Sequence, residues 1–473
     1  MTELLFIVTL AIVFGTIYFL DLIFRTCMLF PYIKFLHDAG ISIRPLTICW
    51  ETMSFNRQFL TLGRFKPNLM RRWFQTGAVI VSACMIPALF LLLVPIYQYL
   101  YVDNSNPILV PIIPGLNLPY SQLFYYAISI FICVTIHEFG HALAASREKV
   151  TIEGFGFALF GFLPMAYVRL PSEQLKQLTL PQQLRIYSAG VWHNVVLASF
   201  ALLLMYANPF LVKPLYQQGN GVTVVNVKEG TGPAQKGGLL LGDTIISIND
   251  CLVETVEDWN SCLQKQMVDP QSGFCVSKDF IRIENSAIDD FNNLNCCHNS
   301  SGNLCFRHSD PDNKQFICLP GRKVAENSII CTENRDCRED LCLIPILLLE
   351  SERFLKIQRF PKNAVLYLGT IQEVFASVAV SPWTSQSTSV QYIDMYEIFL
   401  GYIFAFSSGL AVMNVIPFFY LDGQFLTECV VHNYASSCIP TLSLRSNIIF
   451  ILKMIGSLIG FLSICVTILK MIM

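Results

Sequence analysis

Six stretches of about 20 apolar residues constrain this chain most, because segments of that length and hydrophobicity are stable across a lipid bilayer. They lie at 4–24, 75–98, 121–145, 185–212, 397–420 and 447–471. Charged residues make up only 14% of the 473 residues, against about 25% in an ordinary soluble domain. The sequence therefore predicts a polytopic α-helical membrane protein with about six spans. Its net charge of −2 gives no indication of nucleic-acid binding.

The distribution of Lys and Arg between the loops predicts the orientation of the spans. Segment 25–74 carries eight basic residues against two acidic ones, whereas 99–120 carries no Lys or Arg. We therefore expect residues 1–74 to form an N-terminal span and a basic cytosolic loop. The span at 121–145 then runs from lumen to cytosol, and the span at 185–212 returns to the lumen.

Residues 217–396 are predicted to form a lumenal soluble domain. Ten of the 17 cysteines lie between positions 251 and 342, and no two of them form a Cys-x-x-Cys pair. This pattern favours disulfides in an oxidising compartment over a zinc ribbon, although the spacing leaves the pairing open. The one Asn-x-Ser/Thr sequon, at Asn299, lies in the same stretch and is a candidate glycosylation site.

The start of this domain, "GVTVVNVKEGTGPAQKGGLLLGDTIISIND", alternates apolar residues with Gly-rich turns and predicts a small β-rich module. Residues 238–249 resemble the core of a PDZ domain, which binds an extended peptide as an added strand. An unrelated small β domain is the alternative. The cysteine-rich stretch is expected to be an insertion into or after this module.

Between the third and fourth spans, residues 152–170 are apolar but rich in Gly and interrupted by Pro164. Irregular backbone is stable at membrane depth only where protein or water satisfies its hydrogen bonds. We therefore expect a re-entrant hairpin or sheet that lines a cavity. It belongs to the first part of a membrane catalytic core, residues 75–216, whose second part is residues 397–473.

The sequence His-Glu-Phe-Gly-His at 137–141 places ionisable side chains inside the third span. On a helix, His137 and His141 lie one turn apart on one face and can chelate zinc, with Glu138 beside them as a general base. Zinc lowers the pKa of a bound water and polarises a carbonyl, which is the chemistry of peptide hydrolysis. The alternative is that neighbouring helices satisfy these groups in a bundle core.

A catalytic zinc site needs a third protein ligand. Asp422, in "MNVIPFFYLDGQF", is the best candidate, because Pro417 breaks the fifth span near the depth at which the third span ends. His193 is a rival, although its neighbour Trp192 favours an interfacial position. Asn194 and Asn414 are candidates for substrate binding or oxyanion stabilisation, with interhelical hydrogen bonding as the alternative.

Together, His137-Glu138-Phe139-Gly140-His141, the Asn414-x-x-Pro417-x-x-x-Leu421-Asp422-Gly423 motif and the intervening PDZ-like stretch resemble the site-2 protease family of intramembrane zinc metalloproteases. The cysteine-rich insertion and "QQLRIYSAGVWHN" at 182–194 resemble animal members of this family. The resemblance implies one Zn²⁺ per chain, held by His137, His141 and Asp422. It implies Glu138 as the base. One departure is Val191, where many relatives have Pro after the glycine.

The resemblance also implies substrates and location. Site-2 proteases cut the transmembrane segments of membrane-anchored transcription factors, including sterol regulatory element-binding proteins and a stress-sensor relative. The site-1 protease makes a first lumenal cut, and the second releases the cytosolic domain. The implied location is the Golgi or endoplasmic reticulum membrane, with the active site nearer the cytosolic side.

Two other functions are compatible with the residues. One is a different membrane zinc hydrolase that acts on prenyl-proteins or lipids, which would not need a PDZ-like module. The other is a non-catalytic membrane receptor with a relict motif, against which the intact Glu138 argues.

Overall fold

A computed structural model describes residues 2–102, 111–112, 118–119, 122–235, 237–286, 297, 302–310, 315–385, 388–434, 439 and 441–472. The chain divides into two compact units. The first comprises Met1–Tyr206 and Glu397–Met473, and the second comprises Ala207–Tyr396. Asn299, the candidate glycosylation site, lies outside the described residues.

Six helices are long and apolar enough to cross a membrane, which confirms the expected number of spans. They are α1 (Thr2–Thr26), α4 (Pro67–Tyr101), α5 (Leu123–Arg147), α7 (Leu180–Val212), α12 (Gln391–Val415) and α14 (Leu442–Ile472). Helix α4 begins earlier than expected because Pro67 initiates it. Helix α12 ends five residues earlier than expected, just before Pro417, which cannot continue a helix without losing a hydrogen bond.

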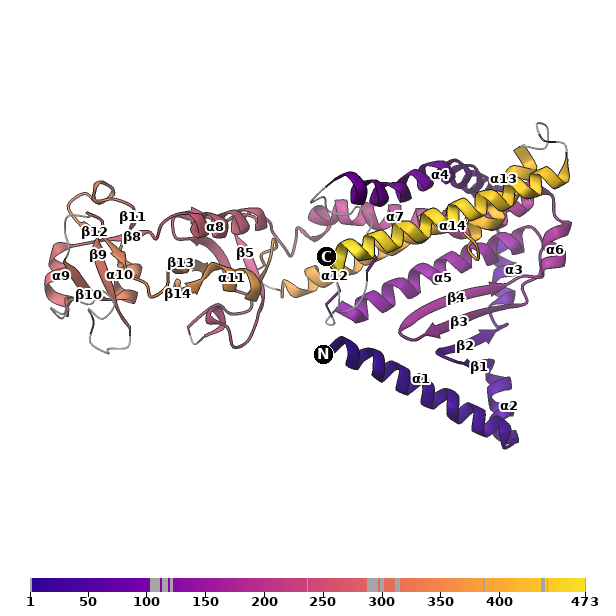
Figure 1. Cartoon of the computed structure of the whole chain (residues 1–473), viewed down its shortest axis with the longest axis horizontal. Helices are drawn as coiled ribbons and strands as arrows, with labels where there is room; N and C mark the ends of the chain where they lie inside the picture. Colours follow the sequence, from indigo (N-terminus) through magenta and orange to yellow (C-terminus); the bar gives the residue numbers. More distant parts are fainter. Residues whose placement is uncertain are drawn as a thin grey trace. The chain divides into compact units, whose positions relative to one another are not determined.

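The predicted hairpin at 152–170 is present as β3 (Gly154–Phe160) and β4 (Leu163–Arg169), which pair antiparallel. It belongs to a four-stranded sheet of order β1-β2-β3-β4, drawn beside α5 in Figure 1. Strands β1 (Ile41–Arg44) and β2 (Thr47–Thr52) come from the basic segment, which also contains α2 (Phe30–Ala39) and α3 (Asn56–Arg64). The segment expected to be a loop is therefore part of the folded core.

A side chain on β2 holds this sheet together across β3. Glu51 accepts a hydrogen bond from the Tyr167 hydroxyl (3.2 Å) and pairs with Arg169 (2.6 Å), both on β4. Gly154 on β3 leaves room for it, because a Cβ there would lie 2.5 Å from the Glu51 carboxylate. The three strands are thus joined by side chains as well as by backbone hydrogen bonds.

The second unit contains a six-stranded sheet of order β14-β13-β6-β5-β15, with β7 paired to β6. Its strands are β5 (Val222–Val227), β6 (Thr244–Ile248), β7 (Cys251–Leu252), β13 (Glu352–Phe360), β14 (Val365–Thr370) and β15 (Val378–Ser381). Helices α8 (Val256–Val268) and α11 (Ile371–Ser377) contribute Trp259 and Val374 to its apolar core. The sheet is therefore built from both ends of the predicted lumenal domain.

The cysteine-rich residues form a second sheet, of order β10-β9-β12-β8-β11. Its strands are β8 (Gly273–Val276), β9 (Asn303–His308), β10 (Phe316–Pro320), β11 (Ile330–Cys331) and β12 (Leu341–Pro345). Along the chain, the short helix α9 (Lys278–Glu284) follows β8 and the short helix α10 (Gly321–Asn327) follows β10. Because β5 and β6 precede this sheet and β13 follows it, the cysteine-rich segment is an insertion into the first β-rich module.

Disulfides hold this insertion, as its composition predicted. The described pairs within it are Cys275–Cys337, Cys297–Cys318 and Cys331–Cys342, and Cys305 is also disulfide-bonded. A further disulfide, Cys251–Cys262, joins β7 to α8 in the first β-rich module. The free cysteines among the described residues all belong to the first unit: Cys27, Cys49, Cys84, Cys133, Cys429 and Cys465. Oxidised and reduced cysteines are therefore separated between the units.

Candidate active site

The three proposed ligands converge in the first unit, although 285 residues separate His137 from Asp422. The Oδ2 atom of Asp422 lies 2.8 Å from Nε2 of His137 and 3.0 Å from Nε2 of His141. The two imidazole Nε2 atoms are 3.2 Å apart. Both histidines are 6% exposed. Donor atoms from α5 and from the start of α13 (Asp422–Tyr434) thus form a compact triangle.

The hydrogen bonding of His141 is compatible with a cation in this triangle. Its Nδ1–H donates to the carbonyl oxygen of Ile186 (2.8 Å), so in the neutral ring Nε2 carries a lone pair. That lone pair faces the carboxylate of Asp422, which is also an acceptor. Zinc fits, because a tetrahedral ion with bonds of about 2.0–2.1 Å separates its ligand atoms by about 3.3 Å.

Asp422 reaches the histidines because the chain unwinds between α12 and α13. In this turn, the Phe418 N–H donates to the Ile416 carbonyl (2.7 Å) and the Phe419 N–H donates to the Ser457 hydroxyl of α14 (3.1 Å). Gly423 is required after Asp422, because a Cβ there would overlap the Ile416 carbonyl. As expected, the carboxylate projects from an unwound segment, and it also begins a new helix, whose N-terminal dipole favours a negative charge.

Two glycines bring α7 close to the ligand-bearing face of α5. A Cβ at Gly140 on α5 would lie 2.7 Å from the Ala189 carbonyl oxygen on α7. A Cβ at Gly190 on α7 would lie 2.6 Å from Nε2 of His137 and closer still to Nε2 of His141. Gly190 therefore forms one wall of the triangle, and any side chain there would collide with both imidazoles.

Asn194, one turn after Gly190, contacts a ligand directly. Its side chain is fully buried, with its amide nitrogen 3.0 Å from Nδ1 of His137, and its Oδ1 has no hydrogen-bond partner. Exchanging the amide oxygen and nitrogen by a rotation of about 180° lets Oδ1 accept a hydrogen bond from Nδ1–H. That arrangement leaves Nε2 of His137 free to bind a metal ion.

Glu138 lies on α5 between the ligands and β4. Its Oε2 atom accepts a hydrogen bond from the Val168 backbone N–H of β4 (3.0 Å). It lies close enough to His141, His137 and Asp422 to interact with them electrostatically. The carboxylate is thus positioned by the sheet beside the triangle, with Oε1 not engaged in a hydrogen bond to any residue that the structure describes.

The other two polar candidates are not part of the triangle. Nδ1 of His193 lies 2.7 Å from the Ala189 carbonyl oxygen one turn earlier, and its ring packs against Trp73 and Phe74. The Asn414 amide donates to the Leu410 carbonyl of its own helix (3.0 Å). His193 is therefore not positioned as the third ligand.

Sequence reasoning did not identify Gly190 or the backbone groups of Ile186 and Val168 as parts of the site. Gly190 has a sequence signal, because it precedes Asn194 by one helical turn in a span otherwise rich in larger residues. The backbone groups have no such signal, since their role depends on tertiary structure alone.

Replacement of Gly190 with alanine tests its position against the ligands. Since the new methyl group would collide with both imidazoles, we expect G190A to lose at least about tenfold in zinc affinity while remaining folded. Zinc content of purified protein by mass spectrometry measures this. G401A is the matched control, because a Cβ at Gly401 on α12 would meet no atom within 4 Å. Equal zinc content in the two variants would contradict the predicted contact.

The role of Asn194 is tested by separating metal binding from turnover. If Asn194 orients His137, N194A should weaken zinc binding by about 10- to 100-fold, as other residues behind metal ligands do. N194D should retain the ion, because a carboxylate oxygen can accept the same hydrogen bond. Competition with a metal chelator measures both affinities. An oxyanion role instead predicts unchanged zinc affinity and a lower kcat in both variants.

Comparisons with known proteins agree with this geometry. The profile described as "Peptidase family M50" matches residues 125–454, more than two thirds of the chain and all of the residues of the triangle. A protein of Arabidopsis thaliana named "Membrane-bound transcription factor site-2 protease homolog" is 30% identical over 207 residues, which cover 44% of this chain and 40% of the relative. The match thus spans less than half of the relative's length. By the extent of the profile match, this chain belongs to peptidase family M50.

Proposed function

We propose that the protein is an intramembrane zinc metalloprotease that hydrolyses peptide bonds in the transmembrane segments of membrane-anchored proteins. The observation that carries this proposal is the convergence of Asp422 on His137 and His141. These two histidines and Glu138 lie on α5, a helix apolar enough to span a bilayer. Ionisable groups within a membrane span are costly unless they are paired or functional. Here they form a metal-ligand set with a base.

The chemistry divides between the metal and Glu138. A zinc ion held by the three ligands would supply a Lewis acid for the scissile carbonyl. Glu138 would take the proton of the attacking water on Oε1, since Oε2 is held by Val168 N–H. The same carboxyl group would then deliver this proton to the leaving amine. Asn194 would keep His137 in the tautomer whose Nε2 can bind the metal.

An unwound substrate segment could pair with the free edge of β4. Along a strand, backbone groups alternate between its two neighbours. Val168 N–H points to Glu138 and away from β3, so Ala166, two residues earlier, also directs its N–H and C=O toward the free edge. A substrate segment paired there would have its backbone groups satisfied and would lie along the base.

The substrate class and location are proposed on several grounds. The printed name of the relative supports membrane-bound transcription factors as substrates. The motif resemblance described above extends this proposal to sterol regulatory element-binding proteins, cut after a first lumenal cleavage by the site-1 protease. The confinement of described disulfides to the second unit supports a lumenal position for it, as expected in the Golgi or endoplasmic reticulum. The order β5, turn, β6, α8 supports a PDZ-like module there.

The E138Q variant separates metal binding from catalysis. Because Gln keeps the shape and the hydrogen bond from Val168 but cannot accept a proton as a base, we expect full zinc content and a fall in cleavage of at least about a hundredfold. Cleavage is measured on a tagged single-span substrate in reconstituted membranes. Cleavage at the wild-type rate by zinc-loaded E138Q would refute the proposed function.

The A166P variant tests the β4 edge. Proline removes the outward N–H but no hydrogen bond to β3, so the sheet should persist while substrate pairing is lost. We expect unchanged zinc content and a fall of about tenfold or more in kcat/KM, consistent with one or two lost backbone hydrogen bonds. A166V keeps the N–H and is the matched control. Similar kcat/KM values for the two variants would exclude pairing at Ala166.

A further inference from the structure

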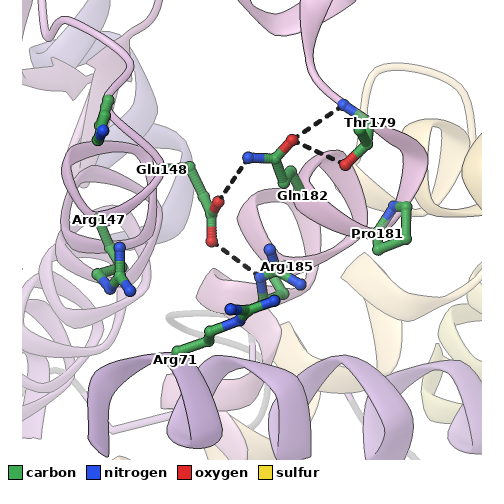
Figure 2. A pocket seen from close by; sticks show the side chains of 8 residues that line it. Arg71, Arg147, Glu148, Thr179, Pro181, Gln182 and Arg185 are labelled. Atoms are coloured by element: carbon green, nitrogen blue, oxygen red, sulfur yellow. Dashed lines mark hydrogen bonds and ion pairs between the residues drawn. The ribbon is translucent and has the colours of Figure 1, made fainter. Parts of the chain in front are cut away.

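A cavity lies where α4 begins, α5 ends and α7 begins. It has a volume of about 450 Å³, within the usual range for small-molecule sites. Four cations and one carboxylate line it: Arg71, Arg147, Lys149, Arg185 and Glu148. Figure 2 labels four members of this set, Arg71, Arg147, Glu148 and Arg185, and marks the Glu148–Arg185 pair with a dashed line. The cavity therefore has a strong positive charge.

The single carboxylate is fully engaged by other groups. Glu148 pairs through Oε1 with Arg185 Nε (2.8 Å), and its Oε2 accepts a hydrogen bond from Gln182 (3.0 Å). Both charged side chains are less than a tenth exposed. Arg185 also donates from Nη1 to Gln75 (3.0 Å), whereas its Nη2 has no acceptor in the described part of the chain. This buried pair forms the base of the cavity.

The three remaining cations are not neutralised. Arg71, Arg147 and Lys149 form no ion pair with any described residue, although Arg147 donates to the Pro67 carbonyl (3.2 Å). Three cations brought together repel one another unless an anion joins them. A phosphomonoester carries a charge of about −1.5 to −2 with three strong acceptor oxygens, which suits this set better than the single charge of a carboxylate.

The position of the cavity along the helices indicates where such a phosphate would come from. Arg71 precedes the apolar part of α4, and Arg147 ends α5. The cavity thus lies at the ends of membrane-crossing helices, at the level of lipid headgroups. In the proposed orientation this is the cytosolic side, where anionic lipids gather and where basic pockets between helices bind them.

We propose that this cavity binds the phosphate group of an anionic ligand, for which a phosphorylated lipid headgroup is the source that its depth favours. Arg71, Arg147 and Lys149 supply the charge, and Arg185, fixed by Glu148 and Gln75, donates from the base. Arg185 immediately precedes Ile186, whose carbonyl holds His141. The phosphate site and the candidate active site therefore share one turn of α7 but no side chain.

The test is a titration of the purified full-length protein with a soluble short-chain phosphatidylinositol 4-phosphate. The variant R71Q/R147Q/K149Q removes the unpaired cations and leaves the Glu148–Arg185 pair intact. At roughly 1 kcal/mol per basic residue, its affinity should fall by about a hundredfold. The control K34Q/R44Q/R57Q removes the same charge from exposed residues outside the cavity and should bind as the wild type does.

Equal loss of affinity in the two triple variants, or no loss in either, would overturn the proposal. If the first triple variant does not fold, K149Q alone should weaken binding by about fivefold. An unchanged affinity of K149Q would also overturn the proposal. Competition with inorganic phosphate identifies the source of the ligand. Displacement of the lipid at comparable concentration indicates a free phosphate, and failure to displace it indicates a lipid headgroup. Both results support phosphate recognition in the cavity.

Discussion

Three acceptor atoms, from His137, His141 and Asp422, lie within 3.2 Å of one another. Such atoms repel unless a cation lies among them, and the packing of the first unit depends on this constraint. Nε2 of His141 faces the carboxylate of Asp422 because its other nitrogen is committed to the Ile186 carbonyl. Gly190 of α7 packs directly against both imidazoles, so that even a methyl group there would collide with them. In apolar surroundings, the metal ion that we propose would contribute to the packing of α5, α7 and α13 as well as to the chemistry.

The spans and the residues that converge as proposed ligands were predictable because each depends on a local pattern. Length and hydrophobicity define a span, His-x-x-x-His places two ligands on one helical face, and Pro417 marks the break that frees Asp422. The third proposed ligand was found from membrane depth, because the predicted topology placed Asp422 at the depth at which the third span ends.

Features that depend on contacts between distant segments were not predictable. Strands β1 and β2 are short and flanked by basic residues, and they are stable because β2 pairs with β3, about a hundred residues later in the chain. Asn194 was a candidate for either substrate binding or interhelical hydrogen bonding. It lies against His137 of α5, a partner that could not be named in advance because sequence gives the depth of a polar side chain but not its neighbour. The start of α13 at Asp422 likewise depends on the packing of the preceding turn against α14.

The four-stranded sheet gives the site a direction. A lone hairpin offers two free edges, and an extended peptide can add to either. Here β2 covers the outer edge of β3, and Glu51 fastens it across to β4. The remaining open edge, β1, is three strand spacings, about 14 Å, from β4. Residues 41–52 lie before the segment matched by the family profile, yet they decide that an added strand can meet Glu138 from one side only. By covering the edge of β3, strands β1 and β2 thus leave β4 as the edge beside Glu138 at which an extended substrate can pair.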